Sequence, residues 1–246
     1  MKKEKDVSQY KRILAIGDIH GAYNKLLDLM NQVDFNPKDD LLIFLGDYID
    51  RGPDSLKSLD YVRDLTIRFP EQVIALMGNH EDMCIRFYKE GNKDDTKFDD
   101  LDEYMIRAWL RNGGRETFEE FKFLKSEDVS ARIQWMKSLP VSYKIGDFYF
   151  CHAGIRPFVP LDEQTKFDLL WIRSEFVSWY DGSMGTIVVG HTVTHNLKRH
   201  HWPSSQPPEK PVFLKNNIIF CDTGAYKKSG KLSCVDVLTK QFWQAG

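Results

Sequence analysis

The stretch from Leu41 to Ser55, LLIFLGDYIDRGPDS, constrains the fold of this chain more than any other part of its sequence. It begins with five successive apolar residues and a glycine, a pattern typical of a short strand that is buried on both faces. Asp47, Asp50 and Arg51 follow directly. Charge beside a hydrophobic core is costly unless it is compensated, so we expect a metal cation and an anionic substrate to meet these side chains.

The overall composition excludes several classes of protein. The chain has 246 residues, a formal net charge of −2 and a pI near 6.4, so it has no basic field for general nucleic-acid binding. The first residues are charged and contain no apolar segment of signal-peptide length, and no run is long enough to cross a membrane. The four cysteines contain no CxxC pair and fit buried, reduced thiols. We therefore expect a single domain over 1–246 that is cytoplasmic, with no nucleic-acid or membrane partner.

The first third of the chain contains the same sequence pattern three times. Apolar runs at 13–16, 41–45 and 73–77 each end at a glycine that is followed by Asp or Asn and then by His or Asp. Amphipathic helices are predicted over 22–33 and from 53 to 65. Strands that alternate with helices indicate βαβ units in a mainly parallel sheet, whose sites form beyond the carboxyl ends of the strands.

The same form returns in the second half of the chain. Apolar runs at 148–151, 187–189 and 218–221 end at His152, at Gly190-His191 and at Asp222. Two further runs, at 231–237 and 241–243, predict a closing antiparallel pair of strands. Each of the polar clusters is weak evidence by itself, but their recurrence at the ends of apolar runs indicates one shared site.

Two segments interrupt the pattern. Residues from about 87 to 140 predict a mostly helical insertion, and its acidic residues are interpreted as a solvated face: Asp94, Asp95, Asp99, Asp100, Asp102 and Glu103. Residues 202–211 (WPSSQPPEKP) predict a proline-rich surface loop.

The polar clusters supply the ligands for a metal centre. They offer carboxylate, imidazole and amide donors, which suit Mn, Fe or Zn better than a soft metal: Asp18, His20, Asp47, Asn79, His152 and His191. Six ligands are too many for one zinc ion and fit two metals that share a carboxylate. Arg51 and Arg173 could hold phosphate oxygens, because a planar guanidinium matches a phosphate bidentately.

These motifs together resemble the calcineurin-like metallophosphoesterases. GDIHG (17–21), GDYIDRG (46–52), GNHE (78–81), HAG (152–154) and GHT (190–192) are similar to the ordered signature of that superfamily, and in particular to its bacterial and phage phosphoprotein phosphatases. The resemblance implies an α/β fold of four layers, α/β/β/α, in which two mixed sheets are flanked by helices. It also implies two divalent metal ions, with Mn²⁺ expected and Fe or Zn as alternatives.

The resemblance further implies a role for each motif residue. Asp18 and His20 match ligands of the first metal, Asp47 the bridging carboxylate, and the other three candidate ligands the second metal. His80 matches the general acid and Asp50 its partner, which by its charge would keep the ring protonated. Arg51 matches a phosphate-binding arginine, and Arg173, in the shorter motif LWIR, resembles a second one. The turn Asn112-Gly113-Gly114 also resembles that subgroup, without an assigned function.

The implied activity is a metal-dependent phosphomonoesterase that uses a metal-activated hydroxide. Its expected substrates are phosphoserine and phosphothreonine proteins, with phosphotyrosine and small aryl phosphates as further candidates. The alternatives are a diadenosine tetraphosphate hydrolase and a catalytically inactive phosphoprotein-binding module. Asp50 before Arg51 favours the phosphatase, because the symmetrical dinucleotide hydrolases generally lack that aspartate. A binding module would not need the complete set of ligands and acid.

Three other features of the sequence are given no catalytic or metal-binding role. Cys151 and Arg156 are one residue too close for a cysteine-phosphatase loop, and Cys151 lies in an apolar run, so it is predicted to be inert. The remaining histidines after His191 are predicted to be exposed and not to bind metal: His195, His200 and His201. The aromatic cluster is predicted to pack in a core or at the rim of the site: Trp171, Phe176, Trp179 and Tyr180.

Overall fold

The computed structural model describes residues 6–90, 107–200 and 209–246, and within them ten strands form two five-stranded sheets. The first sheet has the order β10-β9-β1-β2-β3. Its strands are β1 (Arg12–Ile16), β2 (Asp40–Phe44), β3 (Val73–Ala75), β9 (Leu232–Asp236) and β10 (Phe242–Ala245). The β1, β2 and β3 strands run parallel, whereas β9 pairs antiparallel with both β1 and β10.

The second sheet has the order β4-β5-β6-β8-β7. Its strands are β4 (Ser142–Ile145), β5 (Phe148–Cys151), β6 (Thr186–Val189), β7 (Val212–Phe213) and β8 (Ile218–Phe220). The three central strands are parallel, and the edge strands β4 and β7 pair antiparallel with their neighbours. Each sheet is therefore mixed. The parallel strands of both sheets end at the candidate site described below.

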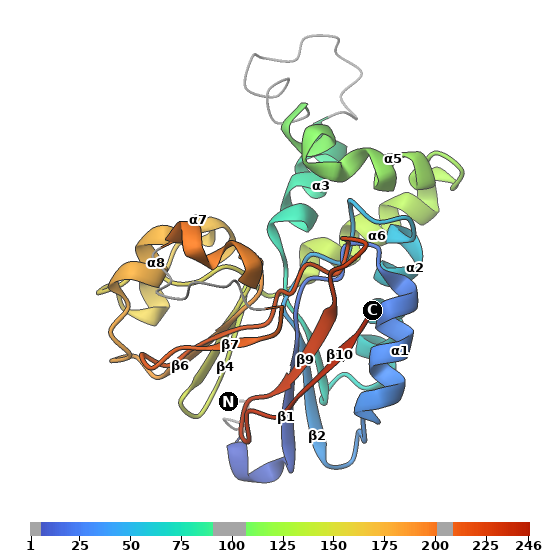
Figure 1. Ribbon diagram of the computed structural model, residues 1–246. Helices are drawn as coiled ribbons and strands as arrows, with labels where there is room; N and C mark the ends of the chain where they lie inside the picture. Colours follow the sequence, from blue (N-terminus) through green and yellow to red (C-terminus); the bar gives the residue numbers. More distant parts are fainter. Residues whose placement is uncertain (1–5, 91–106, 201–208) are drawn as a thin grey trace.

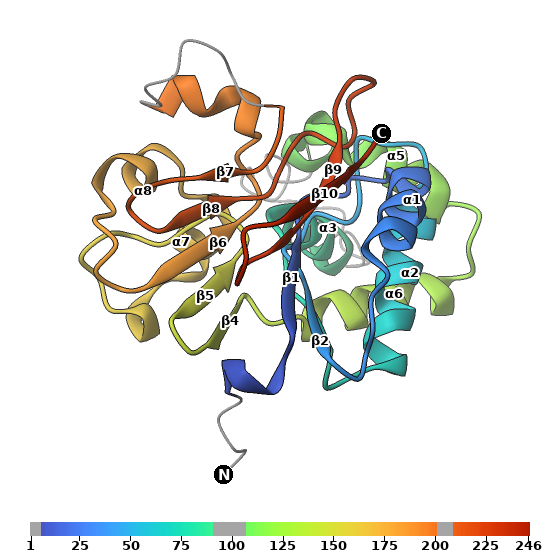
Figure 2. The same ribbon diagram turned by 60° about the horizontal axis from the view of Figure 1, so that its bottom comes forward.

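Helices cover the outer faces of the two sheets (Figure 1 and Figure 2). The first sheet is covered by α1 (Tyr23–Val33) and α2 (Ser55–Arg68), and the second by α7 (Lys166–Trp171) and α8 (Ser174–Trp179). At one end of the molecule lie α3 (Asn79–Glu90), a π-helical turn η2 (Leu110–Gly114), α5 (Arg115–Phe121) and α6 (Ser126–Ser138). Short 3₁₀ helices complete the elements: η1 (Val7–Gln9), η3 (Leu161–Glu163) and η4 (Thr194–His200).

The apolar runs are divided between two faces because side chains alternate along a strand. In β1, Leu14 and Ile16 point toward the helices, while Ile13 and Ala15 point into the layer between the sheets. The second sheet follows the same rule, since Phe150 of β5 enters the layer between the sheets and its neighbours face α7 and α8. This alternation explains why the central runs are apolar at every position.

The fold confirms the predicted four layers and most of the predicted elements. The closing pair is antiparallel, as expected, and the described part of the 87–140 insertion is helical. The expectation of a mainly parallel sheet is too simple, because each sheet also contains two antiparallel pairs: β1–β9 and β9–β10 in the first, and β4–β5 and β7–β8 in the second. The acidic residues from Asp94 to Glu103, and most of the 202–211 loop, lie outside the described residues. No helix in the described ranges is long and apolar enough to cross a membrane.

Packing between the sheets can be tested at Phe150, which is completely buried there. We expect Phe150→Ala to lower the free energy of unfolding by about 3–5 kcal/mol, because the ring leaves a cavity between two sheets. Urea denaturation measures the change. Phe123→Ala is the control, since that ring is 88% exposed, and its effect should stay within about 0.5 kcal/mol. Equal effects of the two substitutions would contradict the packing described here.

Candidate metal centre

The candidate site lies where the parallel strands of both sheets end. The loops after β1, β2, β3, β5, β6 and β8 each bring a polar residue to this place, all of them at most 5% exposed: Asp18, His20, Asp47, Asn79, His152, His191 and Asp222. The backbone of these loops is unusual, since five non-glycine residues have positive φ: His20, Asp47, Asp50, Arg51 and His191. Such conformations are costly and cluster at functional sites.

Close contact between the loops depends on glycines such as Gly46. This residue has φ +99°, and a Cβ placed on it would lie 2.6 Å from Cα of Gly78. The two loops are joined further by the backbone N–H of His80, which donates to Oδ1 of Asp47 at 3.0 Å. Gly46, which ends the apolar run at 41–45, therefore allows the loop that carries Asp47 and the loop that carries Asn79 to lie against each other.

Asp47 occupies the centre of the site. Its Oδ2 lies 3.4 Å from Nε2 of His20 and 3.4 Å from Nε2 of His152. Two groups of possible ligand atoms, each within 4.8 Å of one another, share this carboxylate: His20, Asp47 and His80, and Asp47, His152 and His191. Asp47 is therefore the carboxylate that both groups of candidate ligand atoms have in common.

The other candidate ligands complete the two groups. Asp18 accepts the backbone N–H of His191 at 2.9 and 3.1 Å, and its Oδ2 lies 3.9 Å from Nε2 of His20. Oδ1 of Asn79 lies 2.8 Å from Nε2 of His152. The structure thus brings together all six side chains that the sequence indicated as ligands.

The charges and hydrogen bonds of the site fit divalent cations. Nε2 of His191 is buried and has no hydrogen-bond partner among the described residues. His152 lies within hydrogen-bonding distance of acceptors at both ring nitrogens, the carbonyl of Leu45 and Oδ1 of Asn79. Burial opposes its charge, but Asp47 raises the pKa of His152 to about 9. The protonated ring of His152 therefore carries its positive charge at a position where the surroundings favour a cation. A metal ion that binds there would release this proton.

His80 and Asp50 form a buried pair beside this centre. Nδ1 of His80 lies 2.6 Å from Oδ2 of Asp50. Arg51 lies between His80 and His20, 3.0 Å from Nε2 of each ring. A guanidinium only donates hydrogen bonds, so both Nε2 atoms accept and both rings are neutral.

The protonation of His80 differs from the expectation. Burial lowers the pKa of His80 to about 3, and burial raises the pKa of Asp50 to about 8. Asp50 therefore contacts the ring as expected but does not keep it protonated in this arrangement, because desolvation, together with the positive charge of Arg51, outweighs the attraction of Asp47 in setting the pKa of His80.

The helical insertion holds Asp50, a function that the sequence did not indicate. Nε1 of Trp109 donates to Oδ2 of Asp50 at 2.8 Å, and the hydroxyl of Thr117 donates to Oδ1 at 2.6 Å. The same hydroxyl accepts the backbone N–H of Asp50 at 3.0 Å. Trp109 and Thr117 are fully buried, so both oxygens of Asp50 are fixed.

The turn at Asn112-Gly113-Gly114, to which no function was assigned, holds Arg51. The carbonyl of Gly113 accepts the backbone N–H of Arg51 at 2.9 Å, and the carbonyl of Asn112 accepts from its Nε at 3.3 Å. Gly113 has φ +101°, and a Cβ there would lie 2.5 Å from Cγ of Arg51. The glycine pair within a helical segment was the signal that could have revealed this contact.

Glu81 organises the central loops, and sequence reasoning gave it no role. Its two carboxylate oxygens accept the backbone N–H groups of Asp47, Tyr48 and Gly78 at 2.8–2.9 Å, and that of Ile49 at 3.4 Å. Burial raises the pKa of Glu81 to about 8, and the N–H donors oppose this shift. An acidic residue within a buried motif, directly after His80, was the available signal.

Asp222 and Tyr226, in the loop after β8, also belong to the site. Asp222 is buried beside Asp18; burial, with the charge of Asp222, raises the pKa of Asp18 well above its usual value. The guanidinium carbon of Arg51 lies 4.9 Å from the ring centroid of Tyr226. Asp222 follows an apolar run as the candidate ligands do, so its position could be predicted from the sequence, whereas the approach of Tyr226 to Arg51 could not.

The structure also shows the positions of Arg173, the second candidate phosphate ligand, and of the residues that were given no catalytic or binding role. Nη1 of Arg173 donates to the carbonyl of His191 and to Thr192, both at 3.0 Å, which brings it to the edge of the site.

Cys151 is buried, and burial raises the pKa of its thiol, while Arg156 pairs with Asp168 at 2.8 Å. His195 is exposed. Phe176 and Tyr180 are buried and Trp179 is 65% exposed, so two of these rings pack in the core and the third lies at the surface.

The organising role of Glu81 predicts a loss of metal affinity in Glu81→Gln. One oxygen would become an NH₂ group that faces backbone N–H donors, and we expect the affinity for Mn²⁺ to fall by about 10- to 100-fold. Metal content after dialysis against buffered Mn²⁺ measures it.

Asp236→Asn is the matched control, because Asp236 is a buried carboxylate that also accepts backbone N–H groups, from Ile13 and Leu238, away from the site. Its metal content should stay unchanged. Normal metal affinity in Glu81→Gln would show that the loops hold their shape without this carboxylate.

Sequence comparison adds an independent finding. The profile described as calcineurin-like phosphoesterase matches residues 11–221. The serine/threonine-protein phosphatase 1 of Salmonella typhimurium is 27% identical over 232 residues, which cover 89% of each chain. The symmetrical bis(5'-nucleosyl)-tetraphosphatase of Aromatoleum aromaticum is 29% identical over 147 residues, and that of Erwinia tasmaniensis is 37% identical over 128 residues. These matches cover 59% and 49% of this chain and span less than half of the two tetraphosphatases, 45% and 44%.

Solved structures share the fold. A putative diadenosine tetraphosphatase aligns with a TM-score of 0.66 and 19% identity over 98% of this chain and 96% of its own. A serine/threonine phosphatase from Saccharomyces cerevisiae aligns with a TM-score of 0.65 and 18% identity over 95% of this chain and 75% of its own. At this level of identity the likeness establishes the arrangement of sheets and helices.

Proposed function

The chain belongs to the calcineurin-like phosphoesterase family, and from this premise we propose that it is a phosphomonoesterase that acts on phosphoserine and phosphothreonine in proteins. Phosphotyrosine and small aryl phosphates are further candidate substrates. Two divalent metal ions, with Mn²⁺ favoured and Fe or Zn as alternatives, would supply an activated water and neutralise charge on the phosphoryl group. The observation that carries the proposal is the His80–Asp50 pair, 2.6 Å apart, beside the shared carboxylate Asp47.

The metal ligands in this proposal are the six side chains gathered at the strand ends. Asp18 and His20 lie on one side of Asp47, and three ligands lie on the other: Asn79, His152 and His191. Asp47 serves both sides. The carbonyls of Ile49 and Leu45 accept hydrogen bonds from Nδ1 of His20 and Nδ1 of His152, each at 2.8 Å. These bonds leave the Nε2 atoms toward the centre.

The substrate phosphoryl group would be held by Arg51 and Arg173. Arg51 lies beside Nε2 of both His20 and His80, so a phosphate that contacts its guanidinium also lies next to His80. Arg173 lies at the other side, on the carbonyl of His191. In the arrangement described above, Nε2 of His80 accepts from Arg51 and carries no proton. We propose that Arg51 turns to the bound phosphate, and that His80, held by Asp50 through Nδ1, then takes up a proton from solvent at Nε2 and donates it to the leaving oxygen.

The comparisons support the protein phosphatase in one respect. The Salmonella typhimurium serine/threonine-protein phosphatase 1 matches over 89% of its length, whereas the tetraphosphatases match over less than half of theirs. The helices that hold Asp50 and Arg51 belong to the part of the chain that such a full-length match includes.

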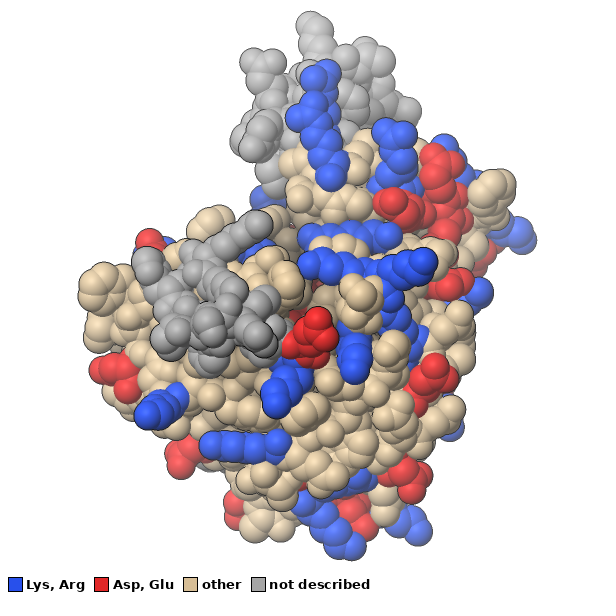
Figure 3. Space-filling model, viewed as in Figure 1, with Lys and Arg blue, Asp and Glu red and all other residues tan. Residues whose placement is uncertain are grey.

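A symmetrical dinucleotide hydrolase is the second candidate. Tetraphosphatases are the more numerous among the relatives compared. A recess of about 200 Å³ also lies beside Tyr226 and is lined by Lys25, Lys227 and Lys228, a chemistry suited to a polyphosphate and a base. Figure 3 shows Lys and Arg side chains gathered over the upper end of β9. An inactive phosphoprotein-binding module is less well supported, because the acid pair and all six ligands are present.

His80→Asn tests the proposed acid. We expect kcat for p-nitrophenyl phosphate or a phosphopeptide to fall by about 10²- to 10⁴-fold, because the leaving oxygen loses its proton donor. Metal content should stay near that of the wild type. His195→Asn replaces an exposed histidine and should leave both quantities unchanged. Loss of metal from His80→Asn would instead identify His80 as a ligand.

The substrate class is tested by comparing kcat/KM for two substrates under the same conditions. With Mn²⁺, we expect a higher kcat/KM for a phosphothreonine peptide than for diadenosine tetraphosphate, because the monoester fits the Arg51 and His80 arrangement without a second nucleotide. Phosphate release and nucleotide chromatography measure the two reactions. A higher kcat/KM for the dinucleotide would overturn the protein phosphatase proposal, and no hydrolysis of either substrate would contradict both enzymatic candidates.

A further inference from the structure

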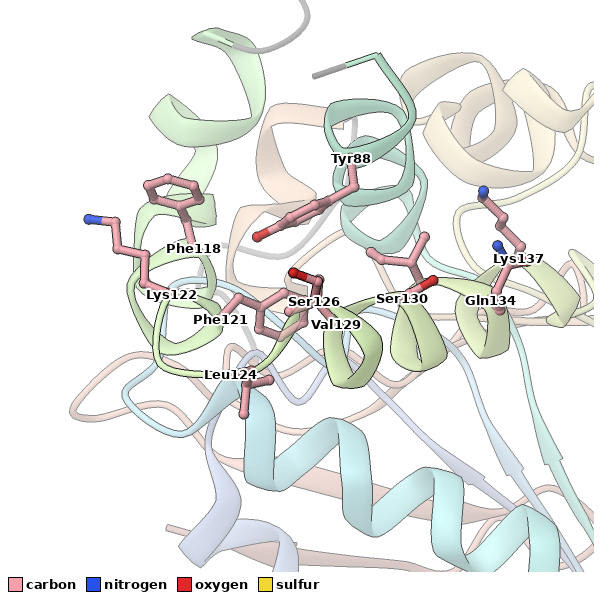
Figure 4. Close-up of a pocket in the computed structure, with 11 residues that line it drawn as sticks. Tyr88, Phe118, Phe121, Lys122, Leu124, Ser126, Val129, Ser130, Gln134 and Lys137 are labelled. Carbon is pink, nitrogen blue, oxygen red and sulfur yellow. The ribbon is translucent and has the colours of Figure 1, made fainter. Parts of the chain in front are cut away.

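A pocket that the proposed reaction does not use lies on the helical insertion, between α3, α5 and α6 (Figure 4). Its volume is about 390 Å³, within the range of about 300–1,000 Å³ that is typical of small-molecule sites. The apolar part of its lining consists of Tyr88, Phe118, Phe121, Leu124, Val129 and Ile133. Ser126, Ser130 and Gln134 of α6 add hydrogen-bonding groups to this lining. The pocket therefore combines an apolar wall with a polar rim.

The two charged residues that line the pocket, among those described, are both lysines. Lys122 and Lys137 lie at opposite ends of it (Figure 4), and no acidic residue lines it in the described part of the chain. Lys122 is already engaged, since its Nζ lies 2.7 Å from Glu119 and 4.8 Å from the ring centroid of Phe118. Lys137, in the last turn of α6, forms no ion pair within the described residues. Among the described residues, no carboxylate pairs with Lys137, so this exposed ammonium group is available to a ligand anion beside the apolar cavity.

We propose that this pocket binds a small amphipathic carboxylate. Its aliphatic or aromatic body would lie against Tyr88, Phe121 and Ile133, where apolar surface leaves water. Its carboxylate would pair with Lys137 and accept hydrogen bonds from the α6 side chains that line the rim. An uncharged alcohol of the same length would fill the same cavity without the ion pair, and so provides a matched ligand.

The pocket wall also contacts the support of the His80–Asp50 pair. Phe118 and Phe121 belong to α5, the helix whose Thr117 hydroxyl is bonded to Asp50. The ring centroid of Tyr88 lies 6.2 Å from that of Trp109, which donates to the same carboxylate. A ligand that joins α3, α5 and α6 would restrict the motion of this support. We therefore expect occupancy to change kcat while KM stays constant, and this part rests on the proposed function.

Calorimetric titration of the Mn²⁺-loaded protein with octanoate and with 1-octanol tests the binding. We expect Lys137→Met to weaken octanoate binding by about tenfold, the loss of one charge-assisted hydrogen bond, and to leave 1-octanol binding unchanged. Lys125→Met is the matched control, because this exposed lysine belongs to the same region and does not line the pocket. Its affinity for both ligands should equal that of the wild type.

Two variants block the cavity. Val129→Trp places an indole in the pocket, and Ser130→Phe provides a second block in case the first variant fails to fold; both should abolish binding of octanoate and 1-octanol. Binding that persists in a folded blocked variant, equal octanoate affinity in Lys137→Met, or no binding to the wild type would each overturn the site.

Kinetics separates this inference from the proposed function. With p-nitrophenyl phosphate, we expect saturating octanoate to raise kcat about fivefold, at the lower end of typical coupling, and Val129→Trp to remove the effect. An unchanged kcat would refute the coupling while the titration still decides the site. Absence of any phosphatase activity would count against the proposed function alone, since the titration does not depend on turnover.

Discussion

Buried negative charge at the junction of the two sheets is the constraint on which the rest of this protein depends. Asp18, Asp47 and Asp222 are each at most 2% exposed and lie together beyond the strand ends. Removing carboxylates from water is costly unless cations or hydrogen bonds compensate them. The protein supplies part of the compensation through a charged His152, and Nε2 of His191, which has no hydrogen-bond partner among the described residues, is free to bind a cation. Divalent metal ions satisfy both requirements.

Rigid loops make this concentration of charge possible. Backbone N–H groups of the loops after β2 and β3 converge on Glu81, and Gly46 lets these loops touch. Positive φ angles at candidate ligands such as His20, Asp47 and His191 store strain that only well-packed surroundings can maintain. The two sheets provide these surroundings, because their shared layer is closed by residues such as Phe150 and Ile43.

The helical insertion connects catalysis to a second region of the molecule. Trp109 and Thr117 hold Asp50, and the turn at Gly113 holds Arg51. The proposed acid and the proposed phosphate ligand thus depend on helices that lie more than fifty residues further along the chain. This arrangement gives the pocket between α3, α5 and α6 a physical route to the site, through side chains in direct contact.

Sequence reasoning predicted all the strands of the first sheet and the three central strands of the second, but it missed the second sheet's edge strands. The strands β1, β2, β5, β6 and β8 are apolar at nearly every position, because both faces are covered, and such runs are easy to recognise. The edge strands β4 and β7 are short or partly exposed, and the six-residue helices α7 and α8 show too few turns for a period. The division into two sheets came from the family resemblance, since periodicity does not tell which sheet a buried strand joins.

By itself, the sequence determined which residues could bind metal and phosphate, because each follows a recognisable apolar run within a recognisable motif. Spacing along the chain also determined that these residues share one edge of the fold. Only the tertiary structure decided which side chains hold them: Glu81 on the central loops, Trp109 and Thr117 on Asp50, and Gly113 on Arg51. It also decided the charge of His80, because a pKa depends on burial and on neighbours that are distant in sequence. The donors are local features of the chain, whereas their support and their protonation arise from contacts that only folding creates.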